Sequence, residues 1–234
     1  MKKLFIIFFI FASFTTFSQS LNPVKYGVKT GLNILTSHLI DDTENDGSKT
    51  PNINSKAGLN FGFYLEIPMT PKWYLNTDLI YSQEGISFNY MYKHEDSLFI
   101  PYSRKEYETN NVLDLNYIKI IPNFTYKFND KVNLGFGPSI SYLLNSSLSY
   151  SEDPLNELIN DPLFDEESII FGANFSIAYY TSEKLLISIN SISNFMSAGS
   201  IDDLSGNIDN TLSQSNSSFK IKNNTLTFSI AYLL

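Results

Sequence analysis

The feature that most constrains this chain is a repeated alternation of apolar and polar residues. In residues 57 to 67 every odd position is apolar, from Ala57 to Ile67, while most even positions are small or polar. Residues 131 to 144 repeat the pattern over a length that can cross a bilayer, since a tilted transmembrane strand needs about 9 to 11 residues. A period of two residues is typical of a β-strand whose two faces meet different surroundings. Six further segments alternate less clearly, namely 25 to 34, 73 to 84, 113 to 128, 168 to 180, 183 to 192 and 224 to 234.

The segment 113 to 128 is the least regular of the eight. It begins with Leu113, Leu115 and Tyr117 as its apolar positions and then continues with Ile118 and Ile120. An extra residue in a strand produces such a change of face. We therefore expect a β-bulge near Tyr117.

Short and long connections take turns along the chain. Residues 68–72, 129–130 and 181–182 are short enough for tight hairpins, whereas the other four connections run to about twenty polar residues. Short turns at one end and long loops at the other are typical of outer-membrane barrels. The sequence therefore predicts an all-β fold, an eight-stranded antiparallel up-and-down transmembrane β-barrel with four long extracellular loops and three short periplasmic turns.

The N-terminal segment has the composition of a signal peptide. Lys2 and Lys3 precede an apolar run from Leu4 to Phe14, and small residues allow cleavage after Ser18. We expect residues 1–18 to be removed on export and residues 19–234 to form one outer-membrane β-barrel domain. The predicted location is the bacterial outer membrane.

Which way the apolar face points is decided by the composition of the other face. That face carries Gly, Ser and Asn together with charged residues, which suits the narrow lumen of an eight-stranded barrel. We expect Glu66 and Asp78 to pair with Lys29, Lys119 or Lys127, because an unpaired buried charge is costly. A secreted lipocalin or β-sandwich, with the apolar face inside, is the alternative. The predicted lumen charges are Lys29, Glu66, Asp78, Lys119 and Lys127.

Aromatic residues fall near strand ends on the apolar face. Outer-membrane barrels carry aromatic girdles at both membrane interfaces, so we expect these residues to meet outer-membrane lipid there. The predicted girdle consists of Trp73, Tyr81, Phe128, Tyr142, Tyr179 and Tyr232.

Charge and cysteine content exclude several classes of protein. The formal net charge is −8 and Lys and Arg form no cluster, so we expect no nucleic-acid partner, because phosphate binding needs a basic surface. The chain has no cysteine and therefore no disulfide. After the N-terminal segment no apolar run approaches the length of a helical span, so any membrane crossing would be made by strands.

The sequence offers little for catalysis or metal binding. His38 and His94 both fall in predicted loops, and no GxSxG motif supplies a nucleophilic serine. The acidic run from Asp42 to Asp46 opens like a calcium loop, but Ile53 stands where a bidentate Glu is needed. We predict no catalytic, cofactor-binding or metal-binding residues and no cofactor, although a site assembled from loop residues stays open as an alternative.

Six segments of the mature chain follow one another in a specific order. They are YGVKTGLN at 26 to 33, AGLNFGFYLEIP at 57 to 68, YLNTDLIYSQEG at 74 to 85, LNYIKIIP at 115 to 122, LGFGPSISYLL at 134 to 144 and the closing NTLTFSIAYLL. With these segments the mature chain resembles the PorT-type outer-membrane β-barrel proteins of Bacteroidetes over nearly its whole length. The resemblance implies a non-enzymatic outer-membrane barrel with a structural or accessory role linked to protein secretion, and with the secretion apparatus or other envelope proteins as partners. A small channel or solute-binding barrel is the alternative, followed by a barrel hydrolase.

Overall fold

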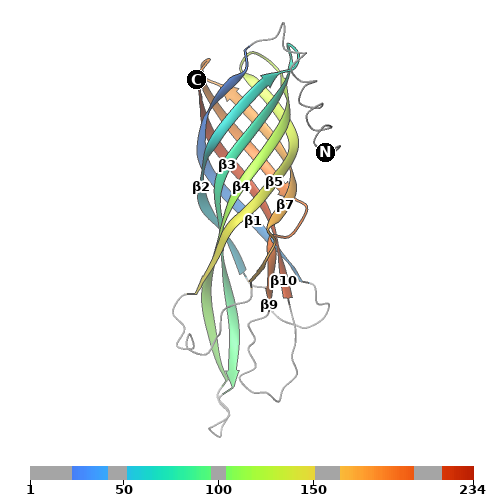
Figure 1. Cartoon of the computed structure of the whole chain (residues 1–234). Helices are drawn as coiled ribbons and strands as arrows, with labels where there is room; N and C mark the ends of the chain where they lie inside the picture. The colour runs from blue at the N-terminus through green and yellow to red at the C-terminus, as the bar shows by residue number, and fades with distance from the viewer. Residues whose placement is uncertain (1–22, 42–51, 96–103, 151–163, 203–217) are drawn as a thin grey trace, which may run out of the picture.

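The computed structural model describes residues 23–41, 52–95, 104–150, 164–202 and 218–234 (Figure 1). The predicted signal peptide, residues 1–18, lies outside these residues, and so does the acidic run from Asp42 to Asp46. In the described ranges no helix has the length and apolar character that a membrane span requires.

Eight long strands follow one another around the wall of a barrel, each antiparallel to the next. The first and last pair from Gly27 with Leu233 to Asp41 with Phe219, and this pairing closes the ring. The predicted eight-stranded up-and-down barrel is confirmed. The strands are β1 (Lys25–Asp41), β2 (Asn52–Pro68), β3 (Trp73–Glu95), β4 (Arg104–Lys127), β5 (Val132–Tyr150), β7 (Ile169–Tyr180), β8 (Leu185–Asn194) and β10 (Ser218–Leu233).

Two short strands continue the wall beyond β7 and β8. β6 (Phe164–Glu166) pairs with β9 (Gly199–Asp202), and β9 pairs with β10 beyond the last partner of β8. β6 therefore leads into β7 and β9 prolongs β8. The barrel therefore has eight strand positions around its circumference. Two of these positions each hold two consecutive strands, β6 with β7 and β8 with β9.

The three short connections and the C-terminus share one end of the barrel, called here the turn end, and the opposite end is the loop end (Figure 1). A side chain stabilises the turn between β4 and β5. Asn129 Oδ1 accepts hydrogen bonds from the backbone N–H groups of Lys131 at 2.9 Å and Val132 at 2.8 Å. An Asn that closes a turn in this way explains why the four residues 128–131 suffice to join the two strands.

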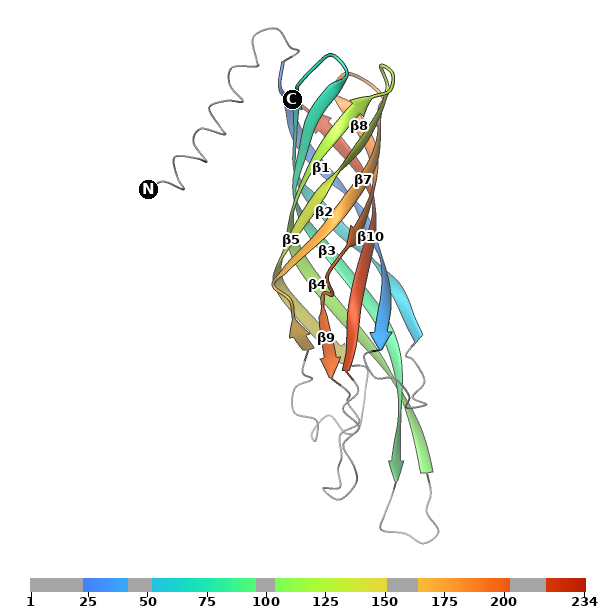
Figure 2. The same ribbon diagram turned by 90° about the vertical axis from the view of Figure 1, so that its right-hand side faces the viewer.

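The strands run further toward the loop end than their alternation indicates. β3 and β4 pair as far as Glu95 with Arg104, whereas the β2–β3 pairing ends at Asn89, and the hairpin projects beyond the rest of the wall (Figure 2). His38 and His94 lie in strands β1 and β3, so their prediction as loop residues is wrong. A strand that leaves the membrane no longer needs an apolar face, and the alternation therefore stops before the strand does.

The apolar face of the strands points outward. Phe63 and Phe136 each keep 65% of their surface exposed, and Phe61 keeps 59%. An exposed apolar surface of this extent is unusual for a soluble protein and suits a lipid surrounding. The soluble alternative, in which these side chains pack together at the centre, does not fit.

The predicted β-bulge lies at Tyr117, in the pairing of β4 with β5, but it does not change the face of β4. The odd positions of β4 stay buried inside the barrel from Leu113 through Tyr117 to Ile121, and its register with β3 is unbroken. The irregularity lies in the pairing with β5, where Asn116 faces Asn145 but Tyr117 faces Leu143. The extra residue is therefore Leu144 of β5. Leu113 and Leu115 are apolar because the lumen itself is apolar at that level.

Apolar layers inside the lumen were not predicted. The larger one, called here the loop-end plug, receives side chains from all eight strand positions. Ile53 is the contribution of β2, and Ala198 lies in the link between β8 and β9. A second cluster of buried apolar residues lies toward the turn end. The plug consists of Leu35, Ile86, Phe88, Leu113, Leu115, Tyr117, Leu143, Ile170, Ala198 and Ile221, with Ile53 and Leu148 packed against them.

Candidate functional site

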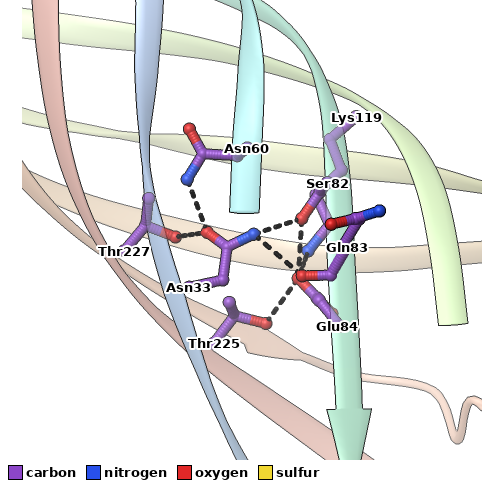
Figure 3. A network of polar contacts seen from close by, with 8 residues as sticks. All are labelled: Asn33, Asn60, Ser82, Gln83, Glu84, Lys119, Thr225 and Thr227. Carbon is purple, nitrogen blue, oxygen red and sulfur yellow. Dashed lines mark hydrogen bonds and ion pairs between the residues drawn. The ribbon is translucent and has the colours of Figure 1, made fainter. Parts of the chain in front are cut away.

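The polar middle of the lumen is organised around the side chain of Asn33 on β1 (Figure 3). Its Nδ2 donates to Ser82 Oγ at 2.8 Å and to the Gln83 carbonyl oxygen at 3.2 Å. Its Oδ1 accepts from Asn60 Nδ2 at 2.8 Å and from Thr227 Oγ1 at 2.9 Å. All four bonds that an amide side chain can form are made, so this residue joins four walls of the barrel.

Next to this network lies a buried ion pair between Glu84 and Lys119 (Figure 3). Only 1% of each side chain is exposed. The same carboxylate oxygen of Glu84 also accepts hydrogen bonds from Ser82 and Thr225, both at 3.1 Å. The buried charge is thus compensated by one cation and two neutral donors, as a buried carboxylate requires.

A second buried ion pair lies nearer the turn end. Lys29 Nζ stands 2.6 Å from Asp78 Oδ2, with 3% and 4% of the side chains exposed. The ammonium also lies 5.9 Å from the ring centroid of Tyr64. Asp78 Oδ1 is buried and has no hydrogen-bond partner among the described residues. The ion pair therefore joins β1 to β3 across the lumen.

The structure brings together some of the predicted lumen charges and separates others. Lys29 and Asp78 meet each other, but Lys119 meets Glu84, which the predicted set omits. Lys127 lies at the turn end, where its partner is the exposed Asp130 of the adjoining turn at 3.1 Å. The position of Glu84, on the same face of its strand as Asp78, was the signal that could have identified it.

The last predicted lumen charge, Glu66, lies in a cavity at the turn end. Its Oε2 accepts hydrogen bonds from the hydroxyl groups of Tyr64, at 2.8 Å, and Tyr180. The side chain is 4% exposed, and the nearest ammonium, Lys25 Nζ, stands 3.9 Å from Oε1. The cavity has a volume of about 280 Å³. Its lining comprises Lys25, Glu66, Tyr74, Lys127, Asp130, Lys131, Asn133, Tyr180, Thr181, Ser182 and Glu183.

The predicted girdle residues occupy two levels of the outer surface. Trp73, Phe128, Tyr179 and Tyr232 lie at the turn end and are exposed. Tyr81 and Tyr142 lie further along β3 and β5. Tyr81 follows Trp73 by about eight residues, which at about 3.3 Å per residue and a tilt of about 40° separates them by about 20 Å along the barrel axis. That separation is close to the height of the apolar band of an outer-membrane barrel, about 25 Å.

The described residues offer no assembled metal centre. No group of three or more His, Asp or Glu side chains in the described ranges is placed to bind a metal ion. The two buried ion pairs, Lys29–Asp78 and Lys119–Glu84, instead join one strand of the barrel to another. The turn-end cavity is the place where a carboxylate, several lysines and aromatic side chains surround open space.

Comparison with known proteins gives one match at the level of sequence families. The sequence model described as "Outer membrane protein beta-barrel domain" matches residues 16–198. No curated protein sequence matches the chain.

Several solved structures are similar to this chain at low sequence identity. The outer membrane protein OprG from Pseudomonas aeruginosa is 9% identical, with a TM-score of 0.48, and the match covers 92% of this chain and 98% of that one. Neisserial surface protein A is 10% identical, with a TM-score of 0.47 and coverage of 90% and 99%. The outer membrane protease OmpT from Escherichia coli is 11% identical, with a TM-score of 0.43 and coverage of 92% and 99%.

Proposed function

Because this chain belongs to the family of outer-membrane β-barrel domain proteins, we propose that it is a closed, non-enzymatic barrel of PorT-like type with a structural or accessory role in the bacterial outer membrane. The single observation that carries the proposal is the loop-end plug. Every wall of the barrel contributes an apolar side chain to it, and Leu35, Leu113 and Leu115 have no exposed surface. A lumen filled in this way leaves no continuous water path, which favours a closed barrel over a channel.

The polar middle of the lumen supports the same conclusion. The ion pairs Lys29–Asp78 and Lys119–Glu84 are nearly unexposed. Side chains that conduct ions or perform chemistry must contact water or substrate. These four groups instead contact each other and neighbouring side chains of the lumen. We therefore assign them to the stability of the wall, and we expect the function to lie at the two ends of the barrel.

Conductance in planar bilayers tests the closed lumen. Purified mature protein should produce no sustained channel. Insertion has to be verified in the same preparation, by flotation with lipid vesicles and by the slower migration on gels of the boiled barrel. Steady conductance from verified, inserted protein would contradict the proposal and favour the channel alternative.

The PorT-like assignment rests on the ordered segments from YGVKTGLN at 26 to 33 to the closing NTLTFSIAYLL. It suggests secretion-apparatus components or other envelope proteins as partners. Deletion of the gene should reduce surface delivery of secreted proteins, and the wild-type gene should restore it. Normal surface delivery in the deletion strain would remove the secretion role and leave the closed barrel in place.

A further inference from the structure

The carboxylate of Glu66 at the turn end is buried but only half satisfied. Both hydrogen bonds, from the hydroxyls of Tyr64 and Tyr180, go to Oε2. Oε1 receives no hydrogen bond from the described residues, and the 3.9 Å to Lys25 Nζ is too long for one. A carboxylate that is 4% exposed and has one free oxygen favours a further donor, preferably a charged one.

The ammonium group of Lys25 lies beside Glu66 and indicates that this position accepts a cation. Its ammonium lies 5.0 Å from the ring centroid of Tyr180 and on the Oε1 side of Glu66, and 38% of its side chain is exposed. An ammonium between an aromatic ring and a carboxylate is a recurring mode of cation recognition. Because it forms no hydrogen bond with Glu66, Lys25 fills this position loosely, and a better-placed donor can displace it.

The cavity around Glu66 has room for a small organic cation. Its volume of about 280 Å³ lies just below the range of drug-sized sites, which begins at about 300 Å³, and Tyr74 and Tyr180 are among the lining residues. Of the other two lysines in the lining, Lys127 is paired with Asp130. The lining carries three lysines, Lys25, Lys127 and Lys131, and three carboxylates, of which Glu66 is buried. A ligand that reaches Glu66 meets a buried negative charge, so we expect that position to favour a cation over an anion.

From these observations we propose that the Glu66 cavity binds a small organic amine from the periplasmic side, with the primary ammonium of the ligand donating to Glu66 Oε1 and taking the place of Lys25. The tyrosine hydroxyls hold the carboxylate in position. The hydrocarbon part of the amine lies against the rings of Tyr74 and Tyr180. This site is independent of any secretion role.

Calorimetric titration of the refolded mature protein in non-ionic detergent micelles tests the site, with putrescine as the probe and succinate as an anion of similar length. Putrescine should bind and succinate should not. Glu66→Gln, which keeps the shape but removes the charge, should weaken binding about tenfold or more, the loss expected for a charge-assisted hydrogen bond. Glu183→Gln removes an exposed carboxylate of the same cavity, whose charge is screened by water, and should weaken binding by clearly less than Glu66→Gln does.

A second variant keeps the test decisive if Glu66→Gln fails to fold. Lys25→Met removes the loosely held ammonium and should strengthen putrescine binding by severalfold. Failure of putrescine to bind, equal losses in Glu66→Gln and Glu183→Gln, or weaker binding by Lys25→Met would each overturn the proposal. Binding of succinate in preference to putrescine would assign the cavity to anions through Lys127 and Lys131 and would equally overturn it.

Discussion

Glu84 and Lys119 form an ion pair inside the barrel in which each side chain keeps only 1% of its surface exposed. The two residues lie on the neighbouring strands β3 and β4, but they are not opposite each other, since Glu84 is paired with Leu115 and Lys119 with Ile80. Thr225 extends the contact to β10, on another part of the wall. The buried carboxylate of Glu84 therefore joins the strands β3, β4 and β10. Disrupting this contact should lower the free energy of unfolding.

Replacing Lys119 by Met should destabilise the barrel by about 3 to 5 kcal/mol, because Glu84 would remain as a buried charge without its cation. Adding Glu84→Gln should recover most of that loss. The control is Lys56→Met, whose partner Asp114 is 2.6 Å away but whose ion pair is 45% and 41% exposed, so that the expected loss is below about 1 kcal/mol. Urea unfolding in lipid vesicles measures each variant. Equal losses for Lys119→Met and Lys56→Met would argue against a buried pair.

The cost of placing a charge on the lipid-facing surface should depend on how deep the residue lies in the bilayer. Phe136 and Phe128 are similarly exposed, at 65% and 68%, but Phe136 lies within β5 and Phe128 at the turn end. Phe136→Lys should cost about 2 to 4 kcal/mol, whereas Phe128→Lys should cost about 1 kcal/mol or less near the interface. The free energy of unfolding in vesicles compares them. A larger cost at Phe128 would place the bilayer at a different height on the barrel.

Gly137 of β5 lies close to the backbone of Pro122 on β4. A Cβ at this position would come within 2.0 Å of the carbonyl oxygen of Pro122. Gly137→Ala should therefore force the two strands apart and cost about 1 to 3 kcal/mol. Ser139→Ala, on the same buried face of β5 but without added volume, serves as the control. If thermal unfolding shows no difference between them, the close approach is absent in the folded protein.

The only tryptophan reports the position of the turn-end girdle. Trp73 is 48% exposed on the outer surface, and its ring lies 5.0 Å from that of Tyr126. At the interface its fluorescence should be quenched more strongly by lipids brominated near the headgroup than by lipids brominated near the end of the chain. Trp73→Phe supplies the background signal. Stronger quenching by deep bromines would move this end of the barrel into the bilayer core.

The sequence predicted the strands of the barrel and their topology better than it predicted the side chains in the lumen. Alternation and the succession of short and long connections were sufficient for strand number, topology and the outward direction of residues such as Phe63. They failed at Leu113 and Leu115, where a polar lumen was assumed and the residues were assigned to the wrong face. They also ended the strands too early, because His38 and His94 lie in strands beyond the alternating segments.

The sequence by itself determined that one face of each strand meets lipid, because a uniform apolar solvent imposes the same requirement on every second residue. The tertiary structure decided which lumen side chains meet. Lys29 and Asp78 are 49 positions apart, and Lys119 and Glu84 are 35 apart. Their meeting depends on the stagger and closure of the strands, which shift partners by whole residues and leave no trace in the alternation. The same stagger brings the hydroxyl groups of Tyr64 and Tyr180 to one oxygen of Glu66, in the lining of the turn-end cavity.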